Sequence, residues 1–318
     1  EIRLSLVGSE MCIRDRTAAC PRRDPLTANA PSRSDRVGAF PCSEMVGDVG
    51  GTRQYDGMAD GYDLDFLPTR VPLPRPAQDA TELTYPRFTV LLDRDRRLAS
   101  VTGVNIDGAL LRELPRTGEW RLDPRIDDEL QTGPDVYARN DLDRGHLVRR
   151  RDPGWGDADE ARDATEATFF YPNAAPQAAG FNQSKDLWLG LEDHVIEYAE
   201  TTDQRVSVFT APVLGDDDPP YRGIRIPLRF WKIAAWQAPD GLSAAGFVLD
   251  QSELVDTSDG LLAAPPLGAF RTFQVPVAEI ARVTKVDVGP LLDADVLARP
   301  SARSTEWRPL ASASDITL

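Results

Sequence analysis

The chain has 318 residues, with 51 acidic against 36 basic side chains and a formal net charge of −15. This length suffices for one large domain or two small ones. The acidic balance argues against a protein that coats nucleic acid non-specifically, because such proteins are basic, but it allows an enzyme that grips a few phosphates. The chain has no run of about 18 apolar residues, so we expect no transmembrane helix and no membrane partner.

The N-terminal quarter of the chain lacks regular patterning. We expect residues 1–80 to form an atypical arm or linker and residues 81–318 to form one catalytic domain. Residues 3–16 resemble a translated sequencing-adapter read-through and are left out of the fold reasoning; a natural disordered leader is the alternative. The Pro-rich stretch 71–80 is typical of an extended linker. No signal peptide can be read, so a secreted and a cytoplasmic location both stay open.

Cysteine usage says little about the main domain. All three cysteines precede residue 43, so the patterned part of the chain needs no disulfide and has no thiolate chemistry.

Regular patterning begins near Tyr85. The apolar, β-branched segments 88–93 and 98–107 predict two strands joined by a short turn. The later expected elements are a short strand within 140–149, a helix at 157–164, a strand at 167–173, a helix at 186–199, strands at 206–213, 227–236 and 244–250, and a helix at 276–284. This order predicts the α+β class, with a mixed, mainly antiparallel sheet and flanking helices.

Two histidines occur in the chain, His146 and His194. His146 lies in the segment NDLDRGHLVRRRD, where a carboxylate, a guanidinium and an imidazole crowd into Asp143 to His146. Cleavage of a phosphodiester needs a base that deprotonates water and cations that offset charge, and this segment can supply both. Considered alone, the pattern is more typical of a solvated salt-bridge loop. His194 is interpreted as a surface residue.

A second polar segment precedes the expected helix at 186–199. Its amide side chains are Asn173, Gln177, Asn182 and Gln183. Neutral amide oxygens suit Mg²⁺, which keeps several waters and needs few protein ligands. The alternative is that Asn182 only caps the helix.

Several motifs occur in order: DRGH at 143–146, an N-x-x-P-Q segment at 173–177, then FNQ and W-x-x-L-E. Together they resemble the DNA/RNA non-specific endonucleases with a ββα-metal active site, the group that includes endonuclease G. The resemblance covers about Tyr85 to Leu292. It implies a metal-dependent hydrolase that cleaves DNA and RNA with little sequence or sugar preference and leaves 5′-phosphate ends. Mg²⁺ is the implied cofactor, and Mn²⁺ accepts the same ligand type.

The resemblance also implies roles for single residues. His146 matches the general base, and Arg144 matches the arginine beside the scissile phosphate. Asn182 matches the single protein ligand of Mg²⁺, and Glu192 matches the acid that positions water on the metal. Asn173 matches an asparagine near the site.

Two positions depart from the family pattern. Glu192 lies ten residues after Asn182, about two more than usual. Since two residues turn a helix by roughly 200°, the extra residues must precede the helix if Glu192 is to serve. Ile196 stands where many relatives carry an arginine that clamps phosphate.

Arg149, Arg150 and Arg151 are the nearest replacements for the missing clamp, and we expect them to contact nucleic acid; the alternative is that they are merely solvated. If the strand from His146 continues that far, Arg150 shares the face of His146. That premise predicts a larger loss of cleavage for Arg150→Ala than for Arg149→Ala.

Two other functions stay open beside the nuclease. One is an inactive nucleic-acid-binding homologue on a decayed nuclease fold. The other is a nuclease effector or toxin domain with an immunity partner. DNA and RNA are the expected substrates, and a homodimer and an inhibitor protein both stay open as partners.

Overall fold

The computed structural model describes residues 61–178, 188–255, 271–298, 307–310 and 315–318. The motif residue Asn182 and all three cysteines lie outside the described residues. None of the described helices is long and apolar enough to cross a membrane.

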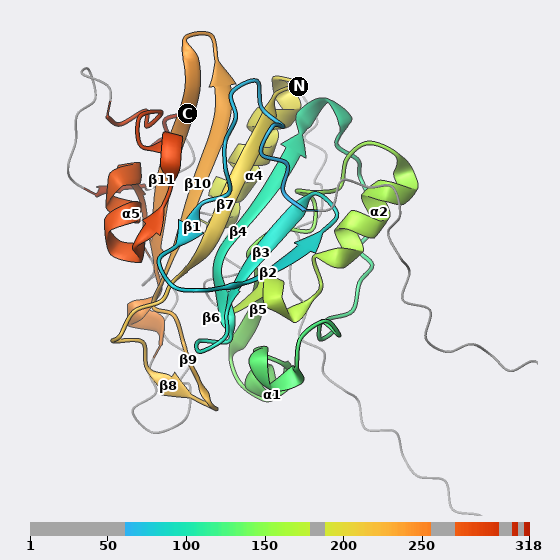
Figure 1. The fold of residues 1–318 in the computed structure, drawn as a ribbon, viewed down its shortest axis with the longest axis vertical. Coiled ribbons are helices and arrows are strands. Elements are labelled where there is room, and N and C mark those ends of the chain that lie inside the picture. The colour runs from blue at the N-terminus through green and yellow to red at the C-terminus, as the bar shows by residue number, and fades with distance from the viewer. Residues whose placement is uncertain (1–60, 179–187, 256–270, 299–306, 311–314) are drawn as a thin grey trace, which may run out of the picture. The chain divides into compact units, whose positions relative to one another are not determined.

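A large antiparallel sheet forms the centre of the folded part (Figure 1). Within the described residues it has eight strands in the order β14-β12-β11-β10-β7-β4-β3-β2, and each neighbouring pair is antiparallel. Their bounds are β2 Thr81–Tyr85, β3 Phe88–Asp93, β4 Leu98–Asp107, β7 Arg205–Val213, β10 Arg229–Ala238, β11 Gly241–Asp250, β12 Arg271–Val275 and β14 Arg308–Pro309.

Both faces of the sheet are covered. All ten residues of β4 are buried. Alternate side chains of β3 pack into different apolar clusters. Val90 and Leu92 belong to one apolar cluster and Leu91 to another, as the two-residue period of a strand requires. A sheet buried on both sides explains why these strands read as continuous apolar runs.

Two helices lie against opposite faces of the sheet (Figure 1). Helix α4 (Trp188–Thr201) places Leu191 and Val195 in the first cluster. Helix α5 (Val277–Thr284) places Val277 and Ile280 in the second. The structure is therefore α+β with a large antiparallel sheet, as the sequence predicts.

A smaller region carries the motif segments. It contains α1 (Pro134–Tyr137), β5 (Leu142–His146), α2 (Ala158–Ala167), β6 (Ala174–Ala178), and the short hairpin of β8 (Pro220–Tyr221) and β9 (Ile224–Arg225). A third apolar cluster joins α1, β5, β6 and that hairpin. Figure 1 shows α1 and the hairpin at the same end of the molecule.

The start of the folded part lies earlier than expected. Phe66, Leu67, Val71 and Leu73 are buried in the second cluster. The pair β1 (Arg75–Pro76) and β13 (Val286–Asp287) adds a short antiparallel ladder. The interpretation of residues 61–76 as linker was therefore wrong, because a few apolar side chains without periodicity were enough to anchor this segment.

The expected strands at 88–93 and 98–107 agree with β3 and β4 to the residue. The strand expected at 167–173 is wrong. Residue 167 ends helix α2, and Tyr171–Asn173 form a 3₁₀ turn. These apolar residues are buried through aromatic packing rather than through a ladder, because Phe170 makes only a single bridge, to Arg121.

Candidate active site

The site is built on the antiparallel pair of strands β5 and β6. The register pairs Arg144 with Pro176 and His146 with Ala174. Because side chains alternate along a strand, Arg144 and His146 share one face of β5. The DRGH segment thus presents its guanidinium and its imidazole side by side.

Gly145 allows the second motif to sit close to the first. A Cβ at this position would lie 2.1 Å from Cδ of Gln177. Gln177 is buried on β6, and its Oε1 has no hydrogen-bond partner among the described residues. Glycine is therefore needed here because the Gln177 side chain packs across the backbone of β5.

Aromatic rings hold the imidazole of His146. The ring centroid lies 4.5 Å from that of Trp120 and 5.0 Å from that of Phe169, with Phe169 edge-on. His146 is half-buried. These rings restrict the rotation of the imidazole and fix which way it faces.

Two tyrosines support Arg144. Its guanidinium carbon lies 5.5 Å from the ring centroid of Tyr137 and 6.0 Å from that of Tyr171. Burial raises the pKa of Tyr137, and the neighbouring Tyr171 raises it further. Tyr137 is therefore neutral, and it supports the arginine as an aromatic surface rather than as a base.

Asn173 acts on the backbone. Its Oδ1 accepts a hydrogen bond from Val148 N at 2.9 Å, and its Nδ2 donates to Val148 O at 2.8 Å and Thr168 O at 2.9 Å. The side chain is fully buried. Asn173 therefore fixes the chain that follows His146, and the role that the structure supports is positioning rather than catalysis.

Glu192 lies between two cations. Its Oε2 is 3.2 Å from Nε of Arg149, and its Oε1 is 3.2 Å from Nζ of Lys232. All three side chains are less than 10% exposed. Arg149 also contacts Asp193, with 2.8 Å between Nη2 and Oδ1. Arg149 ties the segment after His146 to helix α4, and Lys232 ties α4 to strand β10.

Asp152 lies beside this group of charges. Its Oδ2 accepts a hydrogen bond from the backbone N–H of Arg149 at 3.0 Å. Burial raises the pKa of Asp152 to about 6, although Arg149 and Lys232 oppose the shift. Asp152 therefore changes protonation under mildly acidic conditions.

The three arginines after His146 have separate roles. Strand β5 ends at His146, so the premise that put Arg150 on the face of His146 was wrong. Arg149 is buried in its contacts with Glu192 and Asp193. Arg150 donates from Nη1 to Leu114 O at 3.0 Å, and Nη2 of Arg151 lies 3.6 Å from Oε2 of Glu200.

Other expected residues are placed less directly. Asn182 lies outside the described residues. Ile196 is buried in the first apolar cluster, so this position offers no phosphate contact. His194 is half-buried on α4. Within the part of the chain that the structure describes, no group of three or more His, Cys, Asp and Glu side chains could hold a metal.

Sequence reasoning missed Lys232 and Trp120. Lys232 is the one charged residue inside the apolar run FWKIAAW, and a charge in a buried strand needs a partner. That signal was readable. Trp120 lies in a segment without periodicity, so nothing in the sequence links it to His146.

Comparisons with known proteins identify related sequences and a related fold. Residues 69–295 match the family described as DNA/RNA non-specific endonuclease. An uncharacterized protein of Sinorhizobium fredii (strain NBRC 101917 / NGR234), y4fB, is 38% identical over 292 residues, which cover 82% of this chain and 43% of that protein. The chain thus spans less than half the length of this relative.

A solved structure shares the fold. A chain from the crystal structure of the EndoG/EndoGI complex superposes with a TM-score of 0.51 at 20% identity, covering 66% of this chain and 86% of that one. The likeness supports the mixed α+β fold with a large antiparallel sheet.

Proposed function

Because the chain belongs to the DNA/RNA non-specific endonuclease family, we propose that it hydrolyses phosphodiester bonds of DNA and RNA in a metal-dependent reaction. The proposal rests on one observation: Arg144 and His146 share a face of β5, and Arg149, three residues on, reaches Glu192. These contacts support a site in which His146 is the base, Arg144 the cation and Glu192 the carboxylate.

In the proposed reaction His146 is the general base. An imidazole nitrogen takes a proton from water, and the water oxygen attacks phosphorus in line with the 3′ oxygen. The bond from phosphorus to the 3′ oxygen breaks, and that oxygen takes up a proton. The products are a 3′-hydroxyl and a 5′-phosphate. Trp120 and Phe169 hold the imidazole in place, so less orientational entropy is lost when the imidazole takes up its reactive orientation.

Arg144 offsets negative charge at the phosphate. Its guanidinium lies over Tyr137 and Tyr171 and can donate two parallel hydrogen bonds to phosphate oxygens. We propose that it contacts the oxygens that gain charge as water attacks. A donor aimed at developing charge contributes more in a site shielded from water.

The side chains near β5 fit a hard divalent cation. Oε1 of Gln177 is a buried amide oxygen without a partner among the described residues, and Glu192 keeps lone pairs beyond those facing Arg149 and Lys232. We propose Asn182 as the protein ligand, with Glu192 acting through water. A bound Mg²⁺ or Mn²⁺ supplies positive charge to the phosphate and the leaving oxygen.

Glu192 needs its two cations for orientation. Lys232 and Arg149 each face one carboxylate oxygen, so the carboxyl plane cannot rotate without breaking a contact. We propose that this fixed plane aligns water near the phosphate.

The proposed lack of sequence preference follows from contacts with phosphates rather than with bases. Phosphates carry no base identity, so an enzyme that reads phosphates cleaves many sequences. Because His146 rather than the 2′-hydroxyl activates the nucleophile, DNA and RNA both serve.

We also propose that an inhibitor protein binds this chain, since a structural neighbour was solved as the EndoG/EndoGI complex. The intact Arg144 and His146 of the DRGH segment favour an active enzyme over a decayed binding module.

The test is digestion of plasmid DNA and of a transcribed RNA with Mg²⁺, with Mn²⁺ and with EDTA, followed by labelling of the product ends. We expect cleavage of both polymers with metal, none with EDTA, and 5′-phosphate ends. Cleavage that persists in EDTA, or 5′-hydroxyl ends, would contradict the proposal. Binding without cleavage in every condition would favour the inactive homologue.

A further inference from the structure

Four aromatic rings meet where strand β5 ends at His146. The ring centroid of Trp120 lies 4.5 Å from that of His146, 5.5 Å from that of Phe169 and 5.7 Å from that of Tyr171. Phe169 and Tyr171 are buried, whereas Trp120 and His146 are both partly exposed. The part of this group that reaches solvent is therefore formed by an indole and an imidazole that lie side by side.

The backbone holds Trp120 in this place. Arg121 N donates to Phe169 O at 3.0 Å, and Arg121 O accepts from Tyr171 N at 3.0 Å. Gly118 has φ 136° and packs against the Phe169 ring, where a Cβ would lie 2.3 Å from Cε2. The glycine lets the segment pass this close to the ring. A side chain that is fixed in advance loses little entropy when a ligand stacks on it.

A substrate must pass these two exposed rings if His146 is the base. A water that the imidazole deprotonates lies about 3 Å from one of its nitrogens, and the attacked phosphorus lies next to that water. The sugars and bases nearest to Trp120 then belong to the two nucleotides joined by the scissile bond. Every base has a flat aromatic face, so a stack on the indole accepts all of them.

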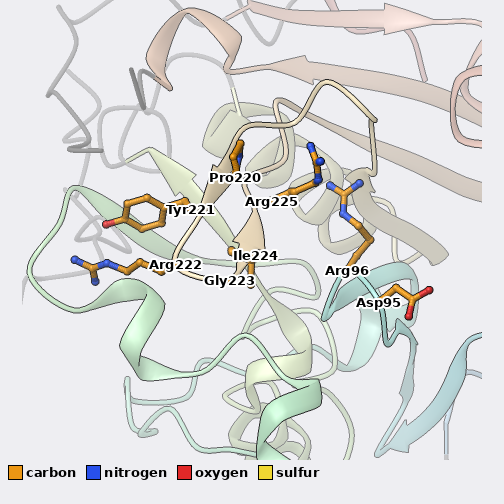
Figure 2. Close-up of a pocket in the computed structure, with 8 residues that line it drawn as sticks. All are labelled: Asp95, Arg96, Pro220, Tyr221, Arg222, Gly223, Ile224 and Arg225. Atoms are coloured by element: carbon orange, nitrogen blue, oxygen red, sulfur yellow. The ribbon is translucent and has the colours of Figure 1, made fainter. Parts of the chain in front are cut away.

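The arginines of the β8–β9 hairpin do not provide a second contact for the phosphate. The hollow beside the hairpin is lined by residues 220–225, Arg96 and the exposed Asp95. Figure 2 shows Arg222 and Arg225 on opposite sides of the hairpin, so they do not converge on one phosphate. A stack on an aromatic ring needs no positive charge, and a chain of net charge −15 can use it.

We propose that Trp120 is a substrate-contact residue, on which the base of a nucleotide flanking the scissile phosphate stacks. The inference rests on the proposed nuclease function. It adds to the phosphate contacts a contact with the face of a base, which reads no sequence because base identity is displayed on the edges. Trp120 then packs on His146 with one part of its ring and meets the base with another.

The test uses a single-stranded DNA oligonucleotide with one tetrahydrofuran abasic residue in its middle, because unpaired bases are free to stack on a protein. The strand is labelled at its 5′ end and digested with Mg²⁺ to less than one cut per molecule. The product ladder gives the relative rate of cleavage at each bond. Remote bonds are the internal reference for the two bonds beside the abasic residue, and the same strand with a thymidine there corrects for position.

Four proteins are compared: wild type, Trp120→Leu, Trp120→Phe and the control Trp307→Leu. Leucine keeps apolar packing against His146 but removes the aromatic face, whereas phenylalanine keeps a smaller aromatic face. Trp307 is a partly exposed tryptophan that packs on Phe273, with 5.3 Å between ring centroids, against the second apolar cluster. Thermal unfolding shows whether each variant is folded.

We expect wild type and Trp307→Leu to cleave at least one bond beside the abasic residue about 5- to 150-fold more slowly than remote bonds, the range of a lost base–aromatic stack. In Trp120→Leu this difference should nearly vanish, because no stack is left to lose. If Trp120 only holds His146, the variant slows all bonds equally and the wild type shows no effect of the abasic residue. That result would overturn the inference, as would an abasic effect equally large in Trp120→Leu.

The test stays decisive if Trp120→Leu does not fold. Trp120→Phe keeps a ring beside His146, and its abasic effect should be smaller than that of the wild type; an undiminished effect would count against the stack. A wild type that cleaves no bond at all would overturn the nuclease function itself. A wild type that cleaves the bonds beside the abasic residue as fast as the remote ones would overturn the stack alone.

Discussion

At the scale of single residues, variants of the charged group around Glu192 distinguish an effect on stability from an effect on catalysis. Removing one partner of a buried ion pair leaves a charge uncompensated, which costs about 3–5 kcal/mol. We expect Lys232→Met to lower the free energy of unfolding by a part of that amount, because Lys232 and Glu192 are both buried but Arg149 still faces the other carboxylate oxygen of Glu192. The double variant Lys232→Met/Glu192→Gln should recover part of this stability, since both charges of the pair are gone while Arg149 keeps its contact with Asp193.

Activity should not recover with stability. If Glu192 is needed in the reaction, the double variant stays impaired although it is folded. Urea unfolding and kcat/KM are measured on the wild type, on Lys232→Met and on the double variant. A double variant that regains both properties would show that the pair is only structural.

We expect substitution of Arg149 to reduce cleavage more than substitution of Arg150 does, which is the opposite of the expectation from the sequence. Arg149 holds Glu192 and Asp193, whereas Arg150 reaches the backbone of Leu114. Loss of a residue that orients a group near the metal typically costs about 10- to 100-fold. We expect that loss in kcat/KM for Arg149→Gln and at most a few-fold loss for Arg150→Gln at fixed salt. An equal or larger loss from Arg150→Gln would contradict this prediction.

Among single residues, the sequence was most informative in a motif that combines a carboxylate, a guanidinium and an imidazole. The motif DRGH singled out Arg144 and His146, and in the structure the two side chains share one face of β5. The partners of these residues were out of reach, because Trp120 and Lys232 come to the site through tertiary packing. Lone residues in aperiodic or apolar segments carry little local signal.

At the scale of elements, the segment after β5 should respond to pH through Asp152. Burial raises its folded pKa to about 6, above the unfolded value of about 3.9. The folded state therefore binds the proton more tightly, and this contribution to stability is lost as pH rises from about 4 to about 6. The charges facing Asp152 are Arg149, Lys232 and Glu192.

Asp152→Asn should remove this loss while keeping an oxygen that accepts from Arg149 N. We expect the stability of the wild type, relative to this variant, to fall across that pH window. Thermal or urea unfolding at pH 4 to 7 measures it. Parallel stability curves for the two proteins would show that Asp152 does not titrate there.

Element prediction succeeded for strands and failed where packing was aromatic. The β3 and β4 bounds follow from runs of β-branched residues. The run at 167–173 has similar apolarity, yet its rings pack on His146 and Tyr137 from a turn. Apolarity reports burial, and only periodicity or pairing partners identify a strand.

At the scale of the whole molecule, the net charge of the chain has the same sign as that of the proposed substrate. The chain carries −15, so attraction to nucleic acid must come from local arginines. Each phosphate contact with duplex DNA releases counterions and adds about 0.9 to the slope of log affinity against log salt. We expect Kd of the wild type to rise steeply between low and physiological salt. A Kd that does not change with salt would contradict recognition through phosphates.

The extent of the folded part was the least predictable feature at this scale. Composition alone made residues 61–80 look like linker, yet Phe66 and Val71 lie in the second core cluster. Nothing in a short aperiodic segment shows which apolar side chains will find a partner. Long apolar strands indicated the fold class because they form most of the sheet.

The central claim is that His146 acts as the base in hydrolysis. The most direct measurement is kcat/KM for cleavage of one duplex by wild type, His146→Ala and His194→Ala, at fixed Mg²⁺ and salt. His194 is the matched control because it is the other histidine of the chain. We predict a loss of about 10²–10⁴ for His146→Ala, the usual contribution of a general base, with His194→Ala near wild type and both folded. Near-normal turnover by a folded His146→Ala protein would contradict the account.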